Sequence, residues 1–278
     1  MQNQEVYDKV MAAFAAKFGG NPAAVAYAPG RIEVLGNHTD YNEGFVFSAA
    51  IDKGTFFAVS PADDDTVTLV ALDINDGETY TCKLADVKKV ESGATWANYP
   101  LGTFNWLFDG EPAKAGKGFK AVFGGNIPLG AGLSSSAALE MATALALQKV
   151  YGTTFGKTEL AKIGQKAEHT FAGCPCGLLD QASSMYGQAG ALVKSDFRTN
   201  EFESVPMGDG VAFMMVKHNL HQFMGVVGLH QDLGANYRVL LNDREFVIRK
   251  LAGFAEHVVA NAHLADIVQV RSMSNQRD

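Results

Sequence analysis

The sequence has few of the features that would place it in a membrane, on nucleic acid or around a zinc ion. Its three cysteines, Cys82, Cys174 and Cys176, form no Cys-x-x-Cys pair. Such an odd cysteine content gives no zinc signature and is typical of a reducing compartment. A net charge of −7 argues against nonspecific nucleic-acid binding and against an anionic membrane surface. No apolar run reaches the length needed to span a membrane.

Three common catalytic motifs are also missing. A Rossmann fingerprint needs a third glycine, but Gly130 and Gly132 are followed by leucine and serines. A Walker loop needs Gly-Lys-Ser/Thr, and the nearest candidate, 116–118, lacks the hydroxyl. No Gly-x-Ser-x-Gly elbow is present, which argues against use of the serines by a hydrolase. The first five residues, MQNQE, lack a basic stretch, so we expect a cytoplasmic protein without a secretory signal.

What the chain does contain is a glycine-rich turn that runs into three serines. Residues 125–140 read GNIPLGAGLSSSAALE. Gly130 and Gly132 have no Cβ, so the backbone can approach an anion closely. Ser134 and Ser135 open a predicted helix whose first amides have no intrahelical partner, and serine hydroxyls can cap a helix, bind phosphate or ligate Mg²⁺. Alone, this pattern fits phosphate binding about as well as it fits a purely structural helix start.

A second polar cluster lies in residues 28–44, which read APGRIEVLGNHTDYNEG. Arg31, Asn37, His38 and Asp40 surround the end of a predicted strand and the loop after it, where several side chains can converge on one pocket. Their donors and acceptors suit a polyhydroxylated ligand. A polar turn built on Asp and Asn explains the same segment, and is the better interpretation of it in isolation.

The third cluster is residues 167–181, AEHTFAGCPCGLLDQ. A helix is predicted to end at Gly173, and Asp180 follows in an apolar setting. A buried carboxylate needs a partner, and Arg31 is the expected cation. Glu168 is a candidate oxygen ligand for Mg²⁺ beside a serine, although alone it is better explained as a solvated helix charge.

Periodicity predicts strands in the first part of the chain and helices in the second, which indicates an α+β fold. The predicted helices cover 6–18, 96–108, 135–151 and 158–172. The predicted strands cover 24–27, 32–35, 45–50, 55–60, 67–71, 120–123, 192–194 and 211–216.

Taken together and in this order, the three clusters resemble the GHMP family of small-molecule kinases and, within it, the galactokinases. Residues 29–44 resemble the galactokinase signature, 128–138 the phosphate loop of the whole family, and 167–181 the segment with the catalytic aspartate. The stretch 96–99 is similar to one near the nucleotide pocket of galactokinases. The resemblance runs from about residue 5 to about residue 218.

The resemblance implies an α+β, two-domain, GHMP kinase-like fold. Residues 1–195 would form an N-terminal domain with a mixed sheet and helices, and 196–278 a partial or divergent C-terminal α+β domain. Residues 221–278 contain neither the Tyr-Asn-x-Arg-Arg stretch nor the late glycine-rich loop of the family. Either this end is truncated and altered, or the chain is a divergent homologue. Its apolar positions predict a helix over 243–263, and we expect the tail to be loosely docked and cut first by protease between His218 and Asn242.

The resemblance also implies the roles of individual residues. The side chains facing the sugar would be Arg31, Asn37, His38, Asp40 and Asp180. Those facing the phosphates of ATP would be Gly130, Gly132, Ser134 and Ser135. Ser134 or a neighbouring serine would hold Mg²⁺ together with Glu168. Asp180 would accept or orient the proton of the sugar hydroxyl, and Arg31 would stabilise the anionic aspartate and the developing charge.

The implied activity is Mg²⁺-dependent transfer of the γ-phosphoryl group of ATP to the anomeric hydroxyl of galactose, by a monomer with no nucleic-acid or membrane partner. Many galactokinases carry Glu where this chain has Asn37, so another GHMP sugar kinase stays an alternative. Because the late glycine-rich loop of the family is missing, two further alternatives stay open. The chain could be a regulatory protein that binds galactose and ATP without turnover, or an inactive fragment.

Overall fold

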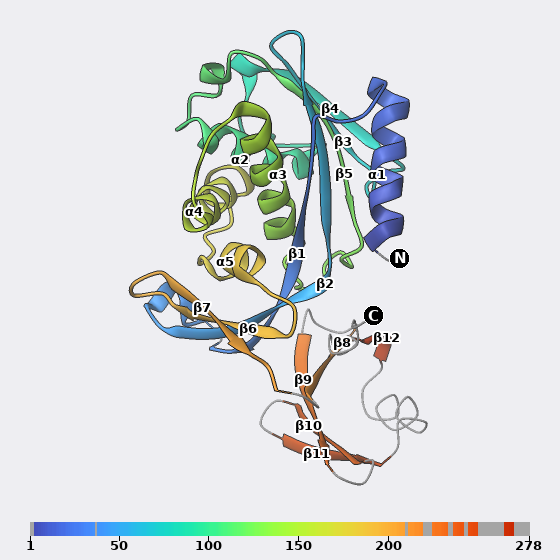
Figure 1. Cartoon of the computed structure of the whole chain (residues 1–278), viewed down its shortest axis with the longest axis vertical. Coiled ribbons are helices and arrows are strands. Elements are labelled where there is room, and N and C mark those ends of the chain that lie inside the picture. Colours follow the sequence, from blue (N-terminus) through green and yellow to red (C-terminus); the bar gives the residue numbers. More distant parts are fainter. Residues whose placement is uncertain are drawn as a thin grey trace.

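The structure, a computed structural model, describes residues 3–36 and 38–208 and five strands beyond them (Figure 1). The first element is helix α1 (Asn3–Phe18), which confirms the predicted helix over 6–18. Val6, Val10 and Phe14 recur along one side of α1 and are buried against the sheet. None of the helices in this described part is long and apolar enough to cross a membrane.

A seven-stranded mixed sheet forms the centre of the molecule. Its order is β4-β3-β5-β2-β6-β7, with β1 paired to β2, and the β3–β5 pair is parallel whereas the others are antiparallel. The strands are β1 (Ala24–Leu35), β2 (Phe45–Pro61), β3 (Thr66–Ala71), β4 (Glu78–Lys83), β5 (Phe119–Gly125), β6 (Ala191–Asp196) and β7 (Glu201–Pro206).

Two pairs of predicted short strands are in fact two long ones. The expected strands at 24–27 and 32–35 are joined in β1, and those at 45–50 and 55–60 in β2. Pro29 and Gly30 belong to the continuous strand β1, and its pairing with β2 shifts register between Pro29 and Arg31. The extra residues lie on β2, because Pro29 pairs with Gly54 whereas Arg31 pairs with Ala50. An irregularity of this kind re-aims the side chains around it, here Arg31.

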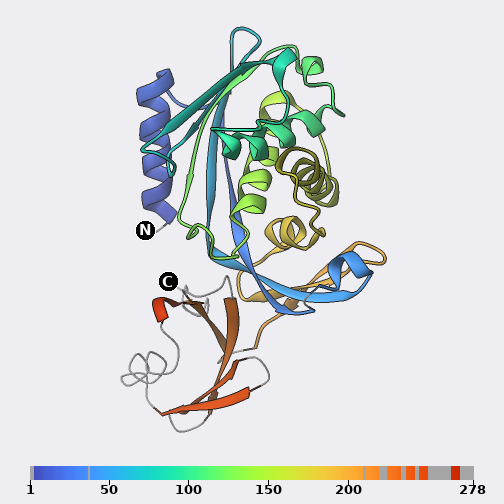
Figure 2. The same cartoon turned by 180° about the vertical axis from the view of Figure 1, so that it is seen from behind.

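Four helices cover the sheet face opposite α1 (Figures 1 and 2). They are α2 (Asn98–Leu107), α3 (Ser135–Tyr151), α4 (Lys157–Ala167), which continues as a π-helical segment (Glu168–Ala172), and α5 (Leu179–Tyr186). Helix α3 is buried on most sides and rich in alanine, so it packs closely against α2, α4 and the sheet. The core between these layers includes Phe57, Phe104, Phe119, Met141 and Leu147. The predicted helices at 96–108, 135–151 and 158–172 are confirmed, whereas α5, β4 and β7 were not predicted.

Beyond residue 208 the described segments are five strands in one antiparallel sheet, ordered β11-β10-β9-β8-β12. They are β8 (Val211–His218), β9 (Met224–Asp232), β10 (Asn236–Leu241), β11 (Arg244–Arg249) and β12 (Leu264–Gln269). The helix predicted over 243–263 is therefore wrong for β11, where a Phe-Val-Ile run pairs with β10. Residues 250–263 lie outside the described residues. The domain boundary at 195/196 stays a prediction; β6 and β7 pair across it.

Candidate functional site

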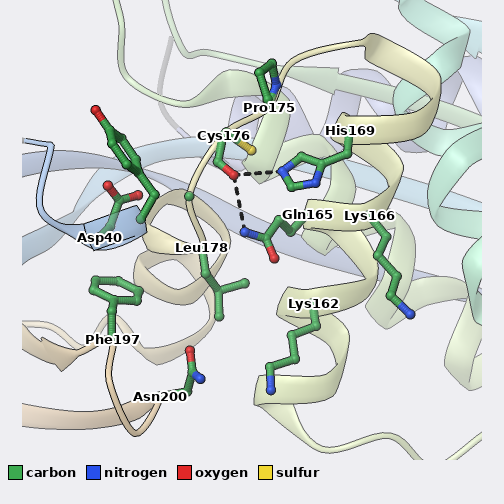
Figure 3. A pocket seen from close by; sticks show the side chains of 12 residues that line it. Asp40, Lys162, Gln165, Lys166, His169, Pro175, Cys176, Leu178, Phe197 and Asn200 are labelled. Atoms are coloured by element: carbon green, nitrogen blue, oxygen red, sulfur yellow. Dashed lines mark hydrogen bonds between the residues drawn. The ribbon is translucent and has the colours of Figure 1, made fainter. Parts of the chain in front are cut away.

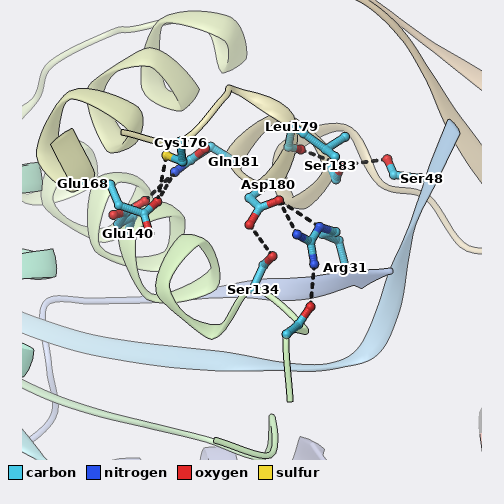
Figure 4. A network of polar contacts seen from close by, with 11 residues as sticks. Arg31, Ser48, Ser134, Glu140, Glu168, Cys176, Leu179, Asp180, Gln181 and Ser183 are labelled. Carbon is cyan, nitrogen blue, oxygen red and sulfur yellow. Dashed lines mark hydrogen bonds and ion pairs between the residues drawn. The ribbon is translucent and has the colours of Figure 1, made fainter. Parts of the chain in front are cut away.

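An ion pair between β1 and α5 lies at the centre of the candidate site (Figure 4). Arg31 Nε and Nη2 both donate to Asp180 Oδ1, at 2.8 and 2.6 Å. The two side chains are only 14% and 25% exposed, so the pair is partly shielded from water. The partner predicted for Asp180 is therefore confirmed. The third guanidinium nitrogen of Arg31, Nη1, donates to the carbonyl oxygen of Gly132 at 2.7 Å and so reaches the glycine-rich loop.

Backbone contacts fix the same three segments to one another. The Arg31 amide donates to the carbonyl oxygen of Leu133 at 3.1 Å, and the Ser184 hydroxyl of α5 donates to that of Pro29 at 2.7 Å. Any Cβ on Gly30 would lie 2.5 Å from the Leu133 oxygen, which is closer than a carbon and an oxygen can approach. Glycine is therefore required here for β1 to lie against the glycine-rich loop.

Ser134 joins the loop to Asp180 from the other side. Its hydroxyl donates to Asp180 Oδ2 at 2.5 Å, and its backbone is left-handed, with φ of +56°. Because this hydroxyl is engaged with Asp180, it makes no cap bond to the start of α3. The first amides of α3, beginning at Ser135, therefore stay free of a side-chain cap and point out of the helix end, as an anion site requires.

In the glycine-rich loop, glycine is favoured by the backbone conformation rather than by lack of space, as it is at Gly30. Gly130 and Gly132 have φ of +66° and +64°, a conformation that favours glycine. A Cβ at Gly130 would meet no atom of the described residues within 4 Å. The loop thus depends on glycine for its backbone shape, and the space beside Gly130 is open.

Glu168, at the start of the π-helical segment, is buried rather than solvated. It is 7% exposed, and its Oε2 accepts hydrogen bonds from Gln181 Nε2 at 2.8 Å and from Cys176 Sγ at 3.3 Å. Burial raises the pKa of Glu168, while contacts with Cys176 and the Ser136 hydroxyl oppose that rise. The serine beside Glu168 is thus Ser136, whereas Ser134 binds Asp180.

The predicted sugar residues of the β1–β2 loop reach the same neighbourhood. Asp40 begins a short 3-10 helix (Asp40–Asn42), and its carboxylate lies so close to Gly177 that a Cβ there would overlap it. His38 is exposed, and its Nδ1 lies 2.7 Å from the Tyr41 hydroxyl. The structure therefore brings Asp40 to the segment that carries Asp180. Asn37 lies outside the described residues.

A hollow of about 540 Å³ opens beside this loop (Figure 3). It lies between Asp40, the 176–178 segment and the outer side of α4, which contributes Lys162 and Gln165. Gln165 Nε2 lies 3.2 Å from the carbonyl oxygen of Cys176, and so braces the segment between hollow and site. Of the predicted site residues that the structure describes, Asp40 alone lines this hollow.

The donor set suits a nucleotide with Mg²⁺. Within the described residues, no group of three or more His, Cys, Asp or Glu side chains could hold a metal. A cation at Glu168 would therefore be completed by a serine hydroxyl, by phosphate oxygens and by water. Magnesium favours such a mixed oxygen set, because it keeps several waters and binds through one or two carboxylates plus phosphates.

Several residues of the site were not predicted from the sequence. Gly177 and Gln181 lie inside the segment quoted for Asp180, and Glu140 lies one helical turn after Ser136. Glu140 is the one charged residue in the apolar run 137–147, and this signal could have marked it. The close approach of Asp40 to Gly177, which leaves no room for a Cβ, cannot be recognised from a single sequence.

Two family models match the chain where the motifs lie. Residues 98–188 match the GHMP kinases N terminal domain, and residues 12–61 match the galactokinase galactose-binding signature. The first range includes the glycine-rich loop and Asp180, and the second includes Arg31 and Asp40.

Solved structures give the same result. The Lactococcus lactis galactokinase complexed with galactose is 32% identical, with a TM-score of 0.69, over 78% of this chain and 56% of that one. The mevalonate kinase of Methanococcus jannaschii is 22% identical over 73% of this chain and 62% of its own, with a TM-score of 0.56, and shares the fold. The present chain thus spans little more than half the length of that galactokinase. The predicted resemblance is confirmed: the chain belongs to the GHMP kinase family and carries the galactose-binding signature of galactokinases.

Proposed function

We propose that this chain binds galactose and ATP and transfers the γ-phosphoryl group to the anomeric hydroxyl of the sugar. The observation that carries the proposal is the contact of Asp180 with both Arg31 and Ser134. These contacts join the sugar signature, the glycine-rich loop and the aspartate segment around one carboxylate. Their presence in a chain with the galactose-binding signature supports galactose over the substrates of other GHMP kinases.

On the sugar side, Asp180 would accept the proton of the reacting hydroxyl. Arg31, paired with it at 2.6 Å, would hold this carboxylate in position for the transfer. Asp40 would hold other hydroxyls of the ring through its carboxylate, and exposed His38 would add a donor or acceptor. Asn37 would contribute an uncharged amide.

On the nucleotide side, the first amides of α3 and the backbone of Gly130 and Gly132 would bind the phosphates, with Ser135 at the helix start. Mg²⁺ would be held by Glu168 with Ser136, or with Ser134 if that hydroxyl leaves Asp180. When bound, the cation would neutralise phosphate charge. The open space beside Gly130 supports a ligand that approaches the loop backbone directly.

The reaction follows from this arrangement. A bond forms between the anomeric oxygen and the γ-phosphorus, while the bond from that phosphorus to the β–γ bridging oxygen breaks. The hydroxyl proton passes to Asp180, and the products are the sugar 1-phosphate and ADP. Catalysis of such transfers rests mainly on positioning and on charge neutralisation. Arg31 and the α3 amides supply positive potential on this side of the site.

A coupled assay of ADP release tests the proposal, with galactose, glucose, N-acetylgalactosamine and mevalonate as acceptors and Asp180→Asn as the matched control. We expect ADP release with galactose that Asp180→Asn lowers by about 10²-fold or more. Release with mevalonate and with no sugar would contradict the galactose assignment. Calorimetric binding of galactose and ATP without product over hours would assign the chain to a regulatory role. The proposal includes a cytoplasmic monomer, and light scattering tests the oligomeric state.

A further inference from the structure

A fully buried amide lies directly beside the proposed catalytic aspartate. Gln181 is 0% exposed, and its Nε2 donates both to Glu140 Oε2 at 2.9 Å and to Glu168 Oε2 at 2.8 Å (Figure 4). One nitrogen therefore holds two carboxyl groups that come from α3 and from the π-helical segment. Of the three residues in this buried chain, Glu140–Gln181–Glu168, only Glu168 has a role in the chemistry proposed above; Gln181 and Glu140 have none.

The geometry of α5 places this chain next to the reaction site. Successive residues of an α-helix point about 100° apart. Asp180 consequently faces Arg31 and Ser134, whereas Gln181 faces inward to the two glutamates. A single helical step thus links the proton acceptor to the residue that holds Glu168.

Helix α4 leaves room for the chain. A Cβ on Gly164 would lie 3.1 Å from Glu140 Oε2, 3.2 Å from Gln181 Cγ and 2.5 Å from Met141 Cε. Any larger residue at this position would press on the contact between the amide and the carboxyl group. The position of this glycine is independent of the hydrogen bonds and points to the same contact.

Packing alone does not account for Glu140. It is 0% exposed in an alanine-rich helix, and its Oε1 has no hydrogen-bond partner among the residues that the structure describes. Burying a carboxyl group that lacks one of its hydrogen bonds costs on the order of several kcal/mol. An apolar side chain at this position would therefore make the fold more stable. The residue is therefore better explained by what it holds than by the stability it adds.

Glu168 needs such support because its other contacts are weak or shared. Cys176 contributes a thiol, which is a poor donor. The Ser136 hydroxyl would itself bind the cation. The segment around Glu168 is π-helical, and such turns depart from regular helix hydrogen bonding. Among the contacts that the structure gives Glu168, the Gln181 amide is the one strong donor that does not compete for the metal.

We propose that Gln181, anchored by Glu140, is a positioning residue that fixes the Glu168 carboxylate relative to Asp180 and so sets the affinity for the divalent cation that accompanies ATP. The inference rests on the proposed function. Residues that orient metal ligands in this way typically change metal affinity 10- to 100-fold when they are replaced. Galactose would bind beside Asp180 and Asp40 rather than against Gln181 or Glu140, so its affinity is expected to stay unchanged.

The test compares Gln181→Met, which keeps the length of the side chain but cannot donate, with Ser183→Ala. Ser183 is a matched control because it lies on the same helix, is also 0% exposed, and donates to the Leu179 carbonyl oxygen and contacts Ser48, away from Glu168. Binding of Mn²⁺ to the full chain is measured by electron paramagnetic resonance with a nonhydrolysable ATP analogue, and galactose binding by calorimetry. We expect Gln181→Met to weaken Mn²⁺ binding at least 10-fold with galactose affinity unchanged, and Ser183→Ala to change neither.

Unchanged Mn²⁺ binding in Gln181→Met, or equal weakening in Ser183→Ala, would overturn the inference. If the parent chain shows no Mn²⁺ site beyond that of the free analogue, the proposed nucleotide site fails as well, which separates the two failures. Glu140 provides a second pair of variants should Gln181→Met not fold. Glu140→Gln keeps an oxygen acceptor for the Gln181 amide and should bind Mn²⁺ as tightly as the parent chain. Glu140→Met has no acceptor and should bind Mn²⁺ more weakly. Equal binding by the two Glu140 variants would also contradict the inference.

Discussion

Replacing Arg31 by methionine should destabilise the protein measurably, because it leaves the Asp180 carboxylate without its cation. Breaking a fully buried ion pair costs about 3–5 kcal/mol. Here the side chains are 14% and 25% exposed, and Asp180 keeps its bond from Ser134, so water and the hydroxyl offset part of this cost. We therefore expect a loss of about 2 kcal/mol in the free energy of unfolding, which corresponds to a fall of about 3–4 °C in Tm at this chain length.

Urea unfolding followed by tryptophan fluorescence measures this loss. The matched control is Arg198→Met, because Arg198 Nη2 lies 2.6 Å from Asp196 Oδ2, the same distance as in the Arg31 pair, but on an arginine that is 54% exposed. The control should leave the urea midpoint close to that of the parent, because water reaches the exposed Arg198 side chain. The Asp196 side chain is 15% exposed, but it keeps the bond from the backbone amide of residue 198 in the variant. A midpoint for Arg31→Met no lower than that of Arg198→Met would refute the argument that partial burial gives the Arg31 pair its strength. The double variant Arg31→Met with Asp180→Asn no longer carries a lone carboxylate. Its loss in free energy of unfolding should therefore be smaller than the sum of the losses in the two single variants.

Three further results are expected. Asp180→Asn should lower kcat for galactose by about 10²-fold or more, the scale for losing a general base, while calorimetry shows galactose binding retained; activity within a few-fold of the parent would leave Asp180 only a structural partner of Arg31. Gly30→Ala should raise the KM for ATP more than the KM for galactose, because its Cβ would push the Leu133 carbonyl and the glycine-rich loop outward, and equal changes in both constants would count against this reading. Glu140→Gln should remove a pH dependence of stability. Burial raises the pKa of Glu140 well above its usual 4.5, so the folded protein keeps a proton that the unfolded chain has lost. Parental stability should then fall from about pH 4.5 up to the folded pKa, by at most about 1.4 kcal/mol per pH unit, and an equal slope in the variant would contradict the assignment.

Local patterns predicted most of the helices and strands of the first 208 residues, and the ion pair at the centre of the site. Helix α1 and helix α3 follow from periodicity, and the Arg31–Asp180 pair follows from the need of a buried carboxylate for a cation. The joining of two predicted strands into β1 depends on a bulge, and nothing near Pro29 in the sequence specifies it. Strand β11 forms through pairing with β10, so the local apolar pattern that predicted a helix there was overridden by tertiary structure.

Finer features of the site depend on backbone geometry that residue types do not specify. The left-handed conformation of Ser134 turns its hydroxyl to Asp180, and this leaves Ser136 as the serine beside Glu168. The sequence offered three adjacent serines with equal chemistry. The hydrogen bond from Gln181 to Glu140 joins positions 41 residues apart, and the two residue types alone do not indicate that they are partners. Such contacts become visible only once helices α3 and α5 are packed together.

The most direct test of the account is a crystal structure of this chain with galactose and a nonhydrolysable ATP analogue in the presence of Mg²⁺. We expect the anomeric hydroxyl within hydrogen-bond distance of Asp180, the phosphates against Gly130, Gly132 and the first amides of α3, and the cation on Glu168. Arg31 should be paired with Asp180 in that complex too, as it is here at 2.6 Å. A sugar bound away from Asp180, with its anomeric hydroxyl out of line with the γ-phosphate, would contradict the claim that the three motifs form one phosphoryl-transfer site.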